Sequence, residues 1–199
     1  ALTFSVTTDN DTLFTQPPTI SASGILTFTP AANANGSATV TVTLSDDGGT
    51  ENGGDDTSDP QNFTININPV NDAPSFIKGM DQTVSEDSGK VTVTGWATAI
   101  SAGPSNESGQ TLTFSVTTDN DDLFAQLPVI SPSSGALTFT PAANANGSTT
   151  VTAVLFDDGQ TVNNGDNTAD PQIISITINP MNDAPEITST PVTNAWQDK

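Results

Sequence analysis

The sequence repeats itself at a spacing of about 110 residues, and this repeat limits the folds open to the chain. Residues 2–20 match residues 112–130 at 15 of 19 positions, and after one inserted residue 24–37 match 135–148 at 13 of 14. Self-similarity at a fixed spacing is the signature of an array, and this spacing corresponds to one ordinary domain per repeat. We therefore expect tandem copies of one small domain and not a short-period solenoid.

A proline-flanked segment marks the end of each copy. Residues 68–74 read NPVNDAP, and residues 179–185 read NPMNDAP. Each segment follows a run with alternating apolar residues, and proline cannot donate to a strand ladder, so we interpret both segments as junctions. The sequence predicts a truncated repeat over 1–71 that lacks its first two strands, a complete repeat over 72–182, and a linker with the first strand of a further repeat over 183–199.

The complete repeat is predicted to consist of short strands separated by polar turns. The predicted strands are Gln82–Val84, Lys90–Ala97, Thr111–Thr118, Leu123–Ile130, Ala136–Thr140, Ser148–Phe156 and Gln172–Ile178. Apolar residues alternate along most of them, which indicates one buried and one wet face per strand. Seven such strands favour an all-β fold, an antiparallel sandwich of two sheets. The predicted core is Trp96, Phe114, Leu137, Phe139, Val151, Leu155, Ile174, Ile176 and Ile178.

The composition narrows the classes of function. The net charge is −20 with only three lysines, which excludes a nucleic-acid binder and disfavours anionic membrane surfaces. No apolar run is long enough to predict direct membrane insertion. Histidine, arginine, tyrosine and cysteine are absent, so most proton-transfer chemistry lacks its usual side chains. We expect a non-catalytic protein.

Several motifs together resemble a known family. They are Val70–Pro74, Ser85–Asp87, Gly95–Pro104, Leu137–Gly147 and Asp157–Gly159. In combination they are similar to the bacterial cadherin-like, Ig-like tandem-repeat domains of giant secreted or cell-surface adhesins. The resemblance implies an Ig-like (cadherin-like) β-sandwich, Ca²⁺ at or near the joints, an extracellular or cell-surface location, and a role as a spacer or adhesive segment.

The predicted topology brings acids that are distant in sequence to the two joints. If strands alternate in direction, Glu107 and the Asp157–Asp170 loop lie at the end that meets Asn71 and Asp72. At the other end, Glu86 and Asp87 would meet Asn182 and Asp183, together with Asn144 and Asn146. Carboxylate, amide and carbonyl oxygens are the ligands of calcium. The candidate metal ligands are Asn71, Asp72, Glu107, Asp157, Asp158, Asp170, Glu86, Asp87, Asn182, Asp183, Asp46 and Asp47.

Other interpretations of these residues remain open. Asp and Asn are common turn residues that bond to their own backbone, and we assign Asp119, Asp121 and Asp122 to a turn. A carbohydrate-binding module would need exposed aromatic side chains, for which only Trp96 and Trp196 are candidates. A filament subunit that exchanges strands is a further alternative, because the first repeat lacks two strands. The expected partners are neighbouring repeats, other copies of the chain, or a cell-surface protein or glycan.

Overall fold

The computed structural model describes residues 1–185, 187 and 197. The chain divides into two compact units. The first unit comprises Ala1–Ala73, Ala102–Thr111 and Asp157–Asn167, and the second comprises Pro74–Ser101, Leu112–Phe156 and Thr168–Lys199. The strand predicted within 183–199 and the side chain of Trp196 lie outside the described residues. No helix in the described part is long and apolar enough to cross a membrane.

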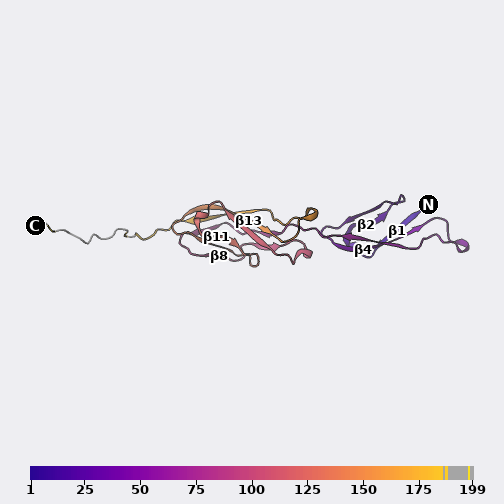
Figure 1. Cartoon of the computed structure of the whole chain (residues 1–199), viewed down its shortest axis with the longest axis horizontal. Coiled ribbons are helices and arrows are strands. Elements are labelled where there is room, and N and C mark those ends of the chain that lie inside the picture. Colours follow the sequence, from indigo (N-terminus) through magenta and orange to yellow (C-terminus); the bar gives the residue numbers. More distant parts are fainter. Residues whose placement is uncertain (186, 188–196, 198–199) are drawn as a thin grey trace. The chain divides into compact units, whose positions relative to one another are not determined.

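The second unit is a sandwich of two main sheets (Figure 1). One sheet has the order β10-β13-β14-β7, formed by Thr113–Thr118, Gly147–Phe156, Gln172–Asn179 and Gln82–Ser85. The other has the order β11-β12-β8, formed by Phe124–Ile130, Leu137–Pro141 and Val91–Val93, and a short pair joins β6 (Ser75–Ile77) to β9 (Thr98–Ser101). A 3-10 turn, η4 (Asp121–Leu123), precedes β11. The all-β sandwich predicted from the sequence is confirmed.

Two details of this sandwich differ from the prediction. The strand predicted over Lys90–Ala97 is interrupted after Val93, because Gly95 takes a positive φ of 60° and turns the chain. Residues 94–97 form a turn, and a further strand that was not predicted, β9, follows over Thr98–Ser101 and pairs with β6. The pair β14–β7 is parallel, whereas all other pairs of described strands are antiparallel.

The alternating apolar residues of the second unit form its core. Leu137, Val151, Leu155 and Ile176 are fully buried, and Phe139 is 1 % exposed. The ring of Phe139 packs edge-to-face on that of Phe124, with centroids 5.8 Å apart, an arrangement that adds to the hydrophobic gain. Eight of the nine predicted core residues are buried, and the ninth, Phe114, is half-buried against the same cluster.

The first unit contains the same strand pattern without the strands that open a repeat. One sheet has the order β1-β4-β5, formed by Thr3–Thr8, Gly36–Ser45 and Gln61–Ile67, and a second pairs β2 (Phe14–Ile20) with β3 (Leu26–Pro30). The 3-10 turns η1 (Asp11–Leu13), η2 (Glu51–Gly53), η3 (Ser105–Glu107) and η5 (Val162–Asn164) also belong to this unit. Phe4 pairs with Leu44 as Phe114 pairs with Leu155, so the repeat preserves the register as well as the sequence.

The same hydrogen bond between an aspartate and the neighbouring strand occurs in both units, directly after β1 and after β10. The Asp119 carboxylate accepts the Thr150 N–H at 2.9 Å and the Thr149 hydroxyl, and Asp9 accepts the Thr39 N–H at 2.8 Å. The Thr149 hydroxyl and the Thr150 N–H lower the pKa of Asp119 from its ordinary value. The structure therefore gives Asp119 the turn role that the sequence analysis assigned to it.

The lowered pKa of Asp119 predicts a pH-dependent contribution to stability. A carboxyl whose pKa is lower in the folded chain stabilises the fold above its unfolded pKa, about 3.9, and this gain is lost as pH falls through the folded pKa. We expect Asp119→Asn to be less stable than wild type at pH 7, and the difference to shrink as pH falls below the unfolded pKa and through the lowered folded pKa. Urea unfolding of both proteins across this pH range measures it, and a constant difference would contradict the assignment.

A glycine in each unit offers a matched test of close packing. In the second unit a Cβ on Gly135 would lie 1.9 Å from the Ala97 carbonyl oxygen, and Gly135 has a φ of +64°. Its counterpart Gly24 has a φ of +83° but nothing within 4 Å. We expect Gly135→Ala to cost about 3 kcal/mol or more, against about 1 kcal/mol for Gly24→Ala, which carries only the backbone strain. Denaturant unfolding of both variants gives the comparison, and equal losses would contradict the packing of Gly135.

Candidate metal-binding group at the linker

The side chain of Asn71 connects the linker to two loops of the first unit, residues 102–111 and 157–167. Its amide nitrogen donates to Asp157 Oδ1 at 3.0 Å and to the Asp166 carbonyl oxygen, while its amide oxygen accepts from Gln110 Nε2. The Asp166 N–H donates back to the Asn71 carbonyl at 2.9 Å. Gly159 permits the contact, because a Cβ there would lie 1.9 Å from Asn71 Oδ1. The linker is thus held by specific bonds to loops that follow β9 and β13.

Glu107 contacts the next linker residue, Asp72. Its side chain is 5 % exposed, and both carboxylate oxygens lie within reach of the Asp72 N–H, at 3.2 and 3.3 Å. Gly103 makes room for it, because a Cβ at that position would lie 2.1 Å from Glu107 Oε2. A buried carboxylate is costly unless hydrogen bonds or a cation compensate it.

Two buried oxygens of this group have no hydrogen-bond partner among the described residues. They are Asp157 Oδ2 and Gln110 Oε1, and Asp157 as a whole is 7 % exposed. The other carboxylate oxygen of Asp157 accepts the Gly159 N–H at 2.8 Å in addition to Asn71. Both unpartnered oxygens belong to side chains that are hydrogen-bonded to the Asn71 side chain. Buried oxygens without donors are the groups that a cation or water would satisfy.

Asp158 contributes a further carboxylate near Asn71. The Asp158 carboxylate accepts the Thr111 N–H at 2.8 Å, and this bond lowers the pKa of the exposed Asp158 carboxyl, which favours its charged form. A surface hollow of about 400 Å³ is lined by Asn71, Glu107, Gln110 and Asp158, among others. Within the described part of the chain the one ion pair is Ala1–Asp47, so no described basic side chain neutralises these acids.

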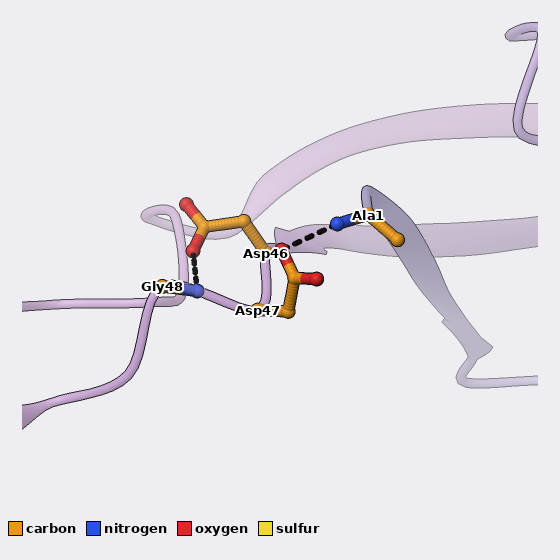
Figure 2. Close-up of polar contacts among 4 residues, drawn as sticks. All are labelled: Ala1, Asp46, Asp47 and Gly48. Atoms are coloured by element: carbon orange, nitrogen blue, oxygen red, sulfur yellow. Dashed lines mark hydrogen bonds and ion pairs between the residues drawn. The ribbon is translucent and has the colours of Figure 1, made fainter.

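The loop Asp46–Gly48 in the first unit repeats the local geometry of Asp157–Gly159. Asp46 Oδ1 accepts the Gly48 N–H at 2.6 Å, as Asp157 Oδ1 accepts the Gly159 N–H, and Asp47 pairs with the Ala1 ammonium (Figure 2). The Asp-Asp-Gly sequence therefore forms this turn by itself. None of the described hydrogen bonds joins Asp46 or Asp47 to Asn71 or Asp72.

The remaining candidates fall into two groups. Glu86 is 3 % exposed and accepts the Met181 N–H at 2.7 Å and Asn146 Nδ2 at 3.3 Å, so it does meet the segment before Asn182. Asp87 is exposed and has a φ of +62°, typical of a turn residue. Asp170, Asn182 and Asp183 are exposed, and their side chains make no described bond to another candidate ligand, apart from the bond of Asn182 Nδ2 to the Asp183 carbonyl.

The donor set at Asn71 suits a hard cation more than a transition metal. It combines carboxylate and amide oxygens, the ligand types of calcium, and contains no nitrogen or sulfur ligand of the zinc type. Among the described residues no three acids gather in one cluster, so amide and backbone oxygens would complete the ligands. The candidates predicted from the sequence include Asn71, Asp72, Glu107, Asp157 and Asp158 but not Gln110, an uncharged residue in a polar loop. Their role as ligands stays a prediction.

Comparisons with solved structures support the fold. The chain is similar to human protocadherin-24 EC1-2, with TM-scores of 0.58 and 0.53 in two crystal structures, at 15 % and 16 % sequence identity. The matches cover 89 % and 91 % of this chain and 81 % and 82 % of those chains. The surface layer protein SbsC, domains 1-6, matches at 13 % identity over 90 % of this chain and 20 % of that chain, but its TM-score of 0.38 carries no argument. No family model and no curated protein matches at the level of sequence.

These matches define the class of fold. The chain contains two cadherin-like β-sandwich domains in tandem, as the motif resemblance implied. Matches at 15–16 % identity establish the architecture alone. The function has to be argued from the residues of this chain.

Proposed function

We propose that the chain is a non-catalytic, calcium-binding segment of a large extracellular or cell-surface protein, acting as a spacer or adhesive region. The observation that carries the proposal is the pair of unpartnered buried oxygens, Asp157 Oδ2 and Gln110 Oε1, beside the linker residue Asn71. Asn71, Glu107, Asp157 and Gln110 would hold the ion. When bound, calcium supplies positive charge that offsets carboxylate repulsion and ties the linker to both loops.

The same proposal explains the excess of acid. Of the 26 charged side chains, 23 are Asp or Glu, and the most buried are Glu86, Glu107 and Asp157. Burial of a carboxylate without a cationic partner opposes folding, and a bound cation would offset this cost. The cadherin-like fold supports an extracellular, structural role by analogy only. Its partners would be neighbouring repeats and a surface protein or glycan.

A carbohydrate-binding role has less support. Trp96 is 3 % exposed and its indole N–H donates to the Met80 carbonyl at 3.0 Å, so its ring is not available as a platform for a sugar. No other tryptophan lies among the described residues. The spacer role is therefore the function that the described side chains favour.

Calorimetric titration of the full chain with calcium tests the proposal. We expect saturable binding to wild type and a loss of affinity of about tenfold or more in Asp157→Asn and in Glu107→Gln, because each removes a charged ligand. Asp122→Asn, an exposed acid in η4, serves as the matched control and should bind as wild type. Absence of binding at millimolar calcium, or equal affinity in all variants, would refute the calcium role.

A further inference from the structure

The side-chain amide of Asn71 is hydrogen-bonded at both of its polar atoms. Its nitrogen donates to Asp157 Oδ1 at 3.0 Å and to the Asp166 carbonyl oxygen, and its oxygen accepts from Gln110 Nε2. An amide nitrogen carries two hydrogens, so these two bonds use the whole donor capacity of the Asn71 side chain. The orientation of the amide is therefore fixed by three bonds to two different loops.

The backbone of Gly159 covers one side of the same amide. The three atoms nearest to a Cβ built on Gly159 are Asn71 Oδ1, Cγ and Nδ2, at 1.9, 2.2 and 2.6 Å. Calcium needs its oxygen ligands at about 2.3–2.6 Å and several of them around it. On the side of Asn71 Oδ1 that faces Gly159, the space for such an ion is taken by the protein backbone.

The two side chains that share a hydrogen bond with the Asn71 amide are the two with an unpartnered buried oxygen. Asp157 uses Oδ1 for this bond and Gln110 uses Nε2, while Asp157 Oδ2 and Gln110 Oε1 have no partner among the described residues. The last torsion of an Asp or Gln side chain has a broad energy minimum. A hydrogen bond to one polar atom of the planar group therefore decides where its second polar atom points.

We infer that Asn71 is a positioning residue of the proposed calcium site and not one of its ligands, an inference that rests on the proposed function. Asn71 holds the ion indirectly, because its amide orients the Asp157 carboxylate and the Gln110 amide. Asp157 Oδ2 and Gln110 Oε1 are then the atoms that contact the ion. Groups that orient the ligands of a metal typically account for about 10–100-fold in metal affinity.

The substitution Asn71→Asp separates the two roles, because they predict opposite results. A ligand at this position would gain a charged oxygen, so calcium would bind as tightly as to wild type or more tightly. A positioning residue would lose its donor, and the new oxygen would face two acceptors, Asp157 Oδ1 and the Asp166 carbonyl. We expect calorimetric titration of the full chain to show calcium affinity about 10–100-fold weaker than in wild type.

A second variant leaves every polar group of the site in place. Gly159→Ala puts a methyl group against the Asn71 amide, and we expect it to weaken calcium binding by about tenfold or more. Gly48→Ala is the matched control in the other Asp-Asp-Gly turn, where a Cβ would meet only the Asp46 side chain, and should change affinity by less than about twofold. In an Asn71→Ala background the methyl group meets no amide, so Gly159→Ala should cause no further loss.

These titrations distinguish failure of the inference from failure of the proposed function. Absence of calcium binding by the wild-type chain would overturn both. Calcium binding by wild type that is equal or tighter in Asn71→Asp, or a Gly159→Ala loss that persists in the Asn71→Ala background, would overturn the positioning role alone. Circular dichroism in chelator establishes which variants fold, and the Gly159 comparison decides the question if Asn71→Asp does not.

Discussion

Phe139→Ala is expected to lower the free energy of unfolding of the second unit by about 3–5 kcal/mol, whereas Phe28→Ala lowers that of the first unit by about 1 kcal/mol or less. The two residues occupy the same position of the repeat, yet Phe139 is 1 % and Phe28 39 % exposed. Removal of a buried ring loses its transfer free energy and leaves a cavity, while removal of a half-solvated ring does neither fully.

Urea unfolding followed by far-UV circular dichroism measures both losses. The pair controls for local sequence, because both phenylalanines lie within LTFTP and contact a second phenylalanine edge-to-face, with Phe14 and Phe28 centroids 5.8 Å apart. Equal destabilisation by the two substitutions would mean that β3 is covered in solution. That result would contradict the exposure of Phe28.

Calcium is expected to raise the melting temperature of the chain by about 5–10 °C at a free concentration one hundred times its dissociation constant. Binding to the folded state alone contributes about 2.7 kcal/mol under that condition, and for a chain of this size about 1 kcal/mol shifts the midpoint by about 2–4 °C. The shift should come from compensation of Asp157 and Glu107, whose carboxylates are buried without a basic partner among the described residues.

Differential scanning calorimetry in calcium and in chelator gives this shift. Asp157→Asn should lose most of it and melt at a similar temperature in both conditions, while Asp122→Asn should retain it. Magnesium at the same concentration should give a smaller shift, because it demands near-ideal octahedral geometry and keeps its water shell. A wild-type melting temperature that does not respond to calcium would contradict the proposal.

The strands were predictable because their apolar residues alternate and their turns contain glycine, asparagine and proline. Ser148–Phe156 and Gln172–Ile178 agree with β13 and β14 to within one residue at each end. The break within Lys90–Ala97 was missed because Trp96 continues the apolar run, although the chain turns at Gly95 to place that ring in the core. The parallel pairing of β7 with β14 depends on how the sheets close, which alternation does not encode.

Strand direction was the only basis on which the sequence could predict which residues meet in the candidate site. Alternating strands were enough to bring Glu107 to Asp72 and Asp157 to Asn71. In the structure the Glu107 carboxylate accepts the Asp72 backbone N–H, and the Asp157 carboxylate accepts the Asn71 side-chain amide. Asp87 and Asp170 were included as acids near the joints; both are exposed, and Asp87 lies in a turn. Their role as ligands stays a prediction. Gln110 was missed because an uncharged residue in a polar loop gives no signal in composition or spacing.

Anomalous diffraction from crystals of the full chain grown in calcium would locate the ion most directly. We expect a calcium peak within about 2.3–2.6 Å of Asp157 Oδ2, with further oxygen ligands from the group around Asn71 and Glu107. Well-ordered crystals in millimolar calcium with no anomalous peak at this group, and with Asp157 Oδ2 and Gln110 Oε1 bonded to water alone, would contradict a calcium-bound linker.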